Sequence, residues 1–111
     1  MEQLLAMMMS VKFMIFIHDT TRESESFTFV AAAHPTERIK NLFRQCINQL
    51  GTLQAYPGAA RVLRLLSTDH PFQIVASEDD LSSPPYIIEE QEARHIPSTE
   101  TVLVIFNTSD N

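Results

Sequence analysis

Side chains that could carry out chemistry are few in this sequence, and they stand far apart. There is one cysteine, Cys46, and no two of the four histidines have the spacing of metal ligands (His18, His34, His70 and His95). Cys46 falls on the apolar stripe of a predicted helix, where a cysteine behaves as a small core residue rather than as a nucleophile. Two glycines in 111 residues leave no phosphate-binding loop. We therefore expect a protein that is not an enzyme and that uses neither a cofactor nor a metal.

The charged residues give a stronger functional signal, because they are unevenly distributed. Residues 1–64 hold seven Lys/Arg and five Asp/Glu, whereas residues 65–111 hold one and nine. The net charge of −6 disfavours nucleic acid and anionic membranes as partners. We predict that a partner protein, or another copy of this chain, binds through two charged patches (basic Lys12, Arg61 and Arg64; acidic Asp69, Glu78, Asp79 and Asp80). The alternative is that these charges only keep a small domain soluble.

Apolar residues alternate with other residues in two early segments, Val11–Ile17 and Ser26–Ala31, and this period of two predicts a pair of strands. In the first strand Phe13, Ile15 and Ile17 share the face that we assign to the core. The other face is mixed, and we expect it to be partly exposed (Lys12, Met14, Phe16 and His18).

The most distinct helical pattern runs over Pro35–Leu50, where apolar residues recur every three or four positions. Pro35 suits the first position of this helix, and Gly51 suits its C-terminal cap. Further along, Arg61–Leu66 and Phe72–Val75 are predicted as strands. Tyr86–His95 is ambiguous between helix and extended chain. The continuous apolar run in Thr101–Phe106 predicts a central strand that is buried on both faces.

The length fits a single domain, which we place at residues 11–107 with tails at residues 1–10 and 108–111. The apolar stretch at the start is too short to span a bilayer and lacks the basic residues of a signal peptide. A single cysteine cannot form an internal disulfide, so nothing indicates an oxidising compartment. We expect a cytoplasmic protein, with the nucleus and the cytoskeleton as alternatives, and no membrane insertion.

The order hairpin, helix and closing strand resembles the ubiquitin-like β-grasp. The segment His95–Val104 is similar to the closing segment of ubiquitin-like domains, in which an isoleucine precedes a polar turn and the last strand. This resemblance implies an α+β fold, with a mixed sheet of four to five strands packed on one main helix at residues 35–50. A ferredoxin-like sandwich is the alternative, and it requires a second helix over Tyr86–His95.

Within that fold, one stretch resembles the Phox-and-Bem-type interaction domain. That family carries an acidic motif after the helix, and here Asp69 precedes a predicted strand that Ser77–Leu81 follows. It also has a lysine on the first strand, where this chain has Lys12. The resemblance implies front-to-back pairing between an acidic and a basic surface, although His70–Pro71 replaces part of the acidic motif.

These observations lead to a non-catalytic module that binds another protein through the charged faces of a ubiquitin-like domain. A second hypothesis is an N-terminal scaffold domain of a larger protein, for example a cytoskeletal or signalling protein, that self-associates. A small enzyme or ligand-binding protein is the third, and it lacks any supporting motif.

Overall fold

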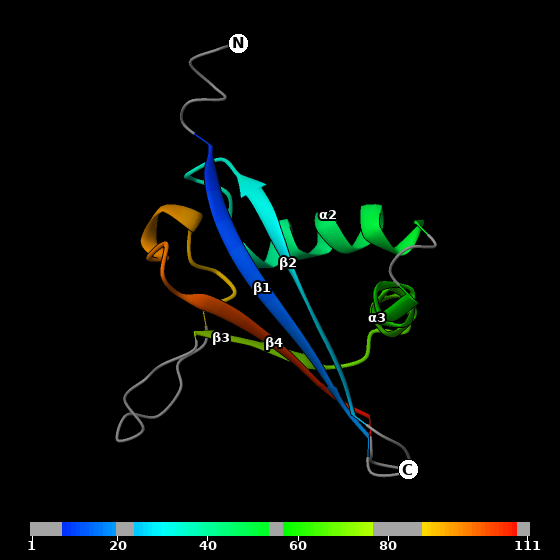
Figure 1. Ribbon diagram of the computed structural model, residues 1–111. Helices are drawn as coiled ribbons and strands as arrows, with labels where there is room; N and C mark the ends of the chain where they lie inside the picture. Colours follow the sequence, from blue (N-terminus) through cyan, green and yellow to red (C-terminus); the bar gives the residue numbers. More distant parts are fainter. Residues whose placement is uncertain (1–7, 20–23, 54–56, 77–87, 109–111) are drawn as a thin grey trace, which may run out of the picture.

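A computed structural model describes residues 8–19, 24–53, 57–76 and 88–108 (Figure 1). Over these residues the chain forms a small α+β domain with four strands and two helices. The elements follow the order β1 (Met9–His18), β2 (Glu25–Ala33), α2 (Ile39–Gly51), α3 (Pro57–Ser67), β3 (Phe72–Ala76), the 3₁₀ turn η1 (Ala93–His95) and β4 (Thr101–Asn107).

The four strands form one mixed sheet in the order β2-β1-β4-β3. The last strand, β4, lies beside the first and runs parallel to it, whereas β2 and β3 are each antiparallel to their neighbour. Phe13 is therefore aligned with Phe29 on one side and with Val102 on the other. The predicted hairpin, the strand after residue 72 and the central place of the closing strand are confirmed.

The core lies between the sheet and the two helices, which share one side of it (Figure 1). The inner face of β1 is fully buried, as the alternation predicts, and so is that of β4 (Phe13, Ile15, Ile17, Val102, Val104 and Phe106). Phe43 of α2 packs into this face with ring centroids 6.0 Å from Phe13, 5.7 Å from Phe72 and 6.4 Å from Phe106. One helical side chain thus contacts aromatic rings of three strands.

The strand predicted at Arg61–Leu66 is wrong, because this segment is part of α3. Ala59 and Val62 are fully buried and Leu66 is partly buried. Their spacings of three and four bring them onto one face of a helix. Six residues were too few to distinguish the two-residue period of a strand from the 3.6-residue period of a helix. The helix begins at Pro57, a residue favoured in the first turn.

The first helix begins at Ile39 and not at Pro35, which lies in a turn. Arg38 has an extended backbone and pairs with Glu92 in an isolated bridge. The N–H groups of Ile39 and Lys40 each donate 2.9 Å hydrogen bonds to carbonyl oxygens of residues 91 and 89. The start of α2 is therefore fixed by a distant segment, which no local capping pattern reveals.

The helix ends also depart from the sequence-based expectation. Gly51 is the last residue of α2 rather than its cap, and Thr52 takes the cap position. The end of α3 is marked by Asp69, whose φ is 56°. The N–H groups of Asp69 and His70 donate to carbonyls of the last turn of α3, the hydrogen-bond pattern that closes many helices with a left-handed residue.

The ambiguous segment Tyr86–His95 holds no α-helix in its described part, residues 88–95, which forms turns, the bridge at Glu92 and the short 3₁₀ helix η1. Ile88 is buried, and its N–H donates to the carbonyl of Ile74 in β3. Ala93 is also buried, and its N–H donates to Glu37 just before α2. This segment therefore ties the sheet to the start of the helix, and the second helix that a ferredoxin-like sandwich needs is not found there.

The closing strand is not buried on both faces, so that prediction is wrong. Val102, Val104 and Phe106 are fully buried, whereas Leu103 and Ile105 are only half-buried. The continuous apolar run arises because one set of residues fills the core and the other faces away from both helices.

The close contact between α3 and β2 predicts the effect of adding one methyl group. A Cβ at Gly58 would lie 2.8 Å from the Phe27 ring, which is a rigid neighbour. Overpacking of this kind lowers the free energy of unfolding by about 1–3 kcal/mol, and the higher helix propensity of alanine offsets only about 1 kcal/mol of this loss. We expect Gly58→Ala to lower the free energy of unfolding by about 1 kcal/mol in urea titration. The loss should shrink when the same change is made in a Phe27→Leu background; an equal loss in both would contradict the contact.

Candidate functional site

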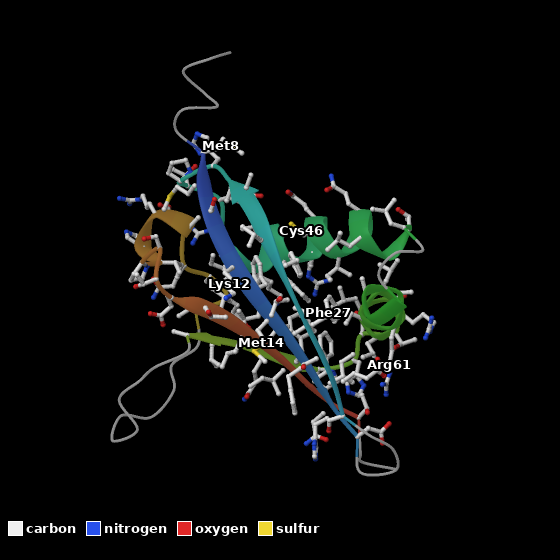
Figure 2. The ribbon with its side chains drawn as sticks, viewed as in Figure 1. Met8, Lys12, Met14, Phe27, Cys46 and Arg61 are labelled. Carbon is white, nitrogen blue, oxygen red and sulfur yellow. The ribbon has the colours of Figure 1, made fainter. Side chains whose placement is uncertain are left out.

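One face of the sheet is packed against the helices, and the opposite face is exposed over much of its area. Alternation places Lys12, Met14 and Phe16 of β1 on this second face. Leu103 and Ile105 of β4 share it, because they align with Met14 and Phe16. In Figure 2 Lys12 and Met14 lie along β1, while Phe27 lies between the sheet and α3. We call this surface the open face.

Four apolar side chains form the centre of the open face (Met14, Phe16, Leu103 and Ile105). Phe16 is 37% exposed and the other three are half-buried. Val30 of β2, aligned with Lys12, is 66% exposed on the same side. The apolar centre thus spans β1 and β4, and Val30 adds one exposed apolar side chain on β2, on a surface that no described helix covers.

Lys12 is the one Lys, Arg, Asp or Glu among the described strand residues of the open face. It is exposed, as the sequence-based hypothesis of a binding residue requires. The remaining polar side chains of this face are those of Ser, Thr, Asn, Gln and His residues. The face therefore combines an apolar centre with a single fixed positive charge.

The two arginines that we grouped with Lys12 lie on α3, on the other side of the sheet. Arg61 is 15% exposed and forms ion pairs with Asp19 at the end of β1 and with Glu25 at the start of β2. The Asp19 contact is 3.1 Å long, and that carboxylate is only 8% exposed. Arg61 thus joins α3 to both strands of the hairpin, while Arg64 is exposed.

The predicted acidic patch is described only at Asp69, because Glu78, Asp79 and Asp80 lie outside the described residues. Asp69 is exposed at the end of α3. It is therefore on the helix side of the molecule and not on the open face with Lys12. Within the described residues, the structure does not bring the predicted charged residues together on one surface.

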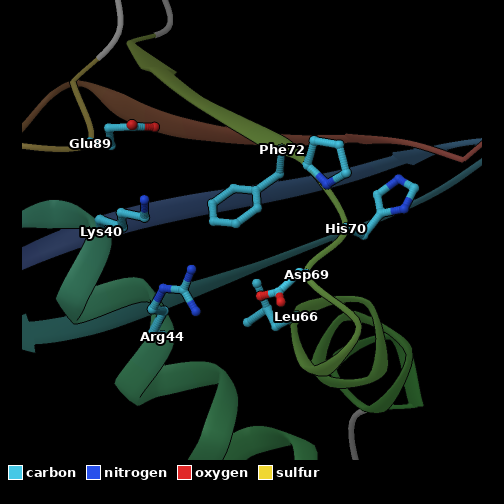
Figure 3. A pocket seen from close by; sticks show the side chains of 8 residues that line it. Lys40, Arg44, Leu66, Asp69, His70, Phe72 and Glu89 are labelled. Carbon is cyan, nitrogen blue, oxygen red and sulfur yellow. The ribbon is translucent and has the colours of Figure 1, made fainter.

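A pocket of about 230 Å³ lies where α2, α3 and the start of β3 meet (Figure 3). Lys40 and Arg44 of α2 lie with their cationic groups 6.0 Å and 5.8 Å from the centroid of the Phe72 ring. Asp69 and Glu89 also line this pocket, so positive and negative groups are balanced within it. Its histidine, His70, has its Nε2 2.9 Å from the backbone oxygen of Asn107, at hydrogen-bond distance. The pocket is small and open, and its cations already have an aromatic partner.

Sequence reasoning missed the apolar centre of the open face as a candidate site. It treated β4 as a strand covered on both faces, which removed Leu103 and Ile105 from the surface. The signal was present, because Met14 and Phe16 already stood on the mixed face of the first strand. Side chains aligned on adjacent strands share one face of a sheet, so the apolar residues of β4 could be placed beside Met14 and Phe16.

The different settings of the two arginines predict different effects on stability. Arg61→Ala removes the cation that Asp19 and Glu25 share, and removal of one partner of a largely buried ion pair is destabilising. We expect this change to lower the free energy of unfolding by roughly 2–4 kcal/mol. Arg64→Ala, one turn away on the exposed side, should change it by less than about 0.5 kcal/mol. Urea unfolding of both variants measures these changes in the free energy of unfolding. Equal changes in the two variants would show that Arg61 has no special structural role.

Comparison with models of known protein families gives no match, and a search of curated proteins gives none either. No helix among the described residues is long and apolar enough to cross a membrane. Within the same residues, no three His, Cys, Asp or Glu side chains gather as they would around a metal ion. Function is therefore inferred from the surfaces of the molecule.

Proposed function

We propose that this chain is a non-catalytic protein-interaction module and that it binds its partner through the open face of the sheet. The observation that carries the proposal is the apolar centre of that face, where Phe16 is exposed and three side chains are half-buried, whereas the opposite face is packed on two helices. Contiguous exposed apolar patches mark protein or membrane interaction sites or ligand-binding grooves.

We further propose that the fold is a ubiquitin-like β-grasp. Its support is the strand order β2-β1-β4-β3. Along the chain the N-terminal hairpin precedes the helices, and the closing strand follows them and pairs parallel with β1. The second helix, α3, and the segment before β4 are additions to the simplest form of that plan. A fold of this kind hosts many functions, so the functional argument is made from the surface and not from the fold.

The chemistry of the open face defines the partner. Its centre needs an apolar surface that excludes water from Phe16 and Ile105, since burial of these side chains supplies the favourable free energy. Lys12 sits beside this centre and needs an acidic group opposite it. A charge in this position sets orientation and association rate as much as affinity. The expected partner is a folded protein with an apolar patch and an adjacent carboxylate.

Substitutions on the open face should weaken binding without unfolding the domain. Candidate partners are recovered by affinity capture, purified, and titrated against the chain by calorimetry. We expect Phe16→Ser to weaken binding by about thirtyfold, the effect of losing a central interface side chain worth about 2 kcal/mol. Lys12→Glu should slow association and reverse the dependence on salt. Circular dichroism and urea unfolding check that each variant remains folded.

Arg64→Ala is the matched control, because Arg64 is exposed on the opposite side of the molecule. It should leave the affinity unchanged for every partner that needs the open face. If each purified partner binds the Phe16→Ser and Lys12→Glu variants as tightly as the native chain, the open face is not the binding surface. Failure to recover any partner that depends on this face would also count against the proposal.

A further inference from the structure

The two edge strands of the sheet, β2 and β3, differ in whether another described segment of the chain bonds to their outer edge. At the β3 edge, the N–H of Ile88 donates a 3.0 Å hydrogen bond to Ile74, so another segment of the chain occupies part of that edge. In the described part of the chain β2 pairs with β1 alone. An unpaired edge strand is a template for another strand, and proteins usually guard such edges with lysine, proline or a bulge. Over Glu25–Ala33, β2 has no lysine or proline, and its register with β1 is continuous.

A groove runs beside this edge, between β2 and α2. It measures about 360 Å³ and is lined by Phe29, Val30, Ala31, Ala32, Cys46, Gln49 and Leu50. Cys46 and Leu50 are half-buried, and Gln49 is exposed. Figure 2 shows Cys46 on α2 near the β2 edge. The groove thus combines unpaired backbone in the sheet layer with incompletely covered side chains in the helix layer.

The groove lining carries no charged residue, in a chain whose net charge is −6. The basic residues of α2 lie on its other flank, where Lys40 and Arg44 approach Phe72. A two-fold symmetric contact brings the same patch of two copies together, and a side chain near the axis meets its own copy. The uncharged flank therefore brings no like charges together in such a contact.

We propose that the β2 edge and the adjoining flank of α2 bind the same surface of a second copy of this chain. The two β2 strands pair antiparallel and extend each sheet into one of eight strands, and the two α2 helices meet above the junction. A second copy fits better than an isolated peptide, because the groove spans two layers. A peptide strand would fill only the sheet layer, whereas a second copy brings a helix above its strand. This site is separate from the open face.

The first measurement is the oligomeric state of the full chain. Sedimentation velocity over about 10 µM to about 1 mM, a range suited to a weak dimer, should show a concentration-dependent shift from monomer to dimer. Gln49→Lys introduces a cation into the otherwise uncharged contact on both copies and should raise the dimer dissociation constant at least about tenfold. Asn48→Lys is the matched control, because it is exposed on the same helix, adds the same charge and lies outside the groove.

The single cysteine gives a local readout that separates this dimer from any other. Cys46 lines the groove, and burial raises the pKa of its thiol, so alkylation is slow at neutral pH and is followed at higher pH. The alkylation rate should fall several-fold as the protein concentration rises through the dimer transition. In Gln49→Lys the rate should stay at its dilute value, and in Asn48→Lys it should fall as in the native chain.

Each remaining outcome supports or overturns the proposal. A strictly monomeric chain across the whole range overturns it, and so does a Cys46 alkylation rate that does not change with concentration. A dimer that survives Gln49→Lys but is lost in Phe16→Ser would show association through the open face instead. Retention of the dimer in Phe16→Ser together with loss of partner binding would show that the two surfaces act independently.

Discussion

The packing of Phe43 into the inner face of the sheet is the interaction on which the rest of the structure depends. Its ring lies within 6.4 Å of the rings of Phe13, Phe72 and Phe106, which belong to three different strands. This contact fixes where α2 lies over the sheet and how it is rotated about its axis. The rotation directs Lys40 toward Phe72 and leaves Cys46 beside β2. The pocket and the groove are therefore two sides of one helix whose orientation an aromatic side chain determines.

A second consequence is that both described helices cover the same face of the sheet. The two helices are both used on the inner face, where the residues of β1 and β4 are fully buried. Met14 and Ile105 remain on the other face because strand geometry sends alternate side chains to opposite sides. Exposure of the open face thus follows from the position of both described helices on the inner face.

Much of the fold could be predicted from the sequence, because period-two alternation over long segments has one interpretation. The hairpin and the closing strand were found in this way. The prediction failed where a pattern covered few residues or where a boundary depends on contacts distant in the sequence. Arg61–Leu66 fits either period over six residues, and the start of α2 depends on carbonyls about fifty residues away. The charged candidates could be named but not assembled, because whether Lys12 and Arg61 share a side depends on α3 being a helix.

The proposed contacts at the edge and at the open face would recognise different properties of a partner, so one small domain could use both. Strand pairing at β2 would be carried by backbone hydrogen bonds, which nearly any sequence supplies, so discrimination there would come from side chains that fill the groove. A second copy would meet this condition, since it carries the same groove residues, among them Leu50 and Phe29. At the open face, selectivity would come from the shape around Phe16 and from Lys12. Pairing at the edge would also place two open faces on the same side of one continuous sheet. A partner with two copies of its own patch would then gain from an increased effective concentration, without any change at the contact itself.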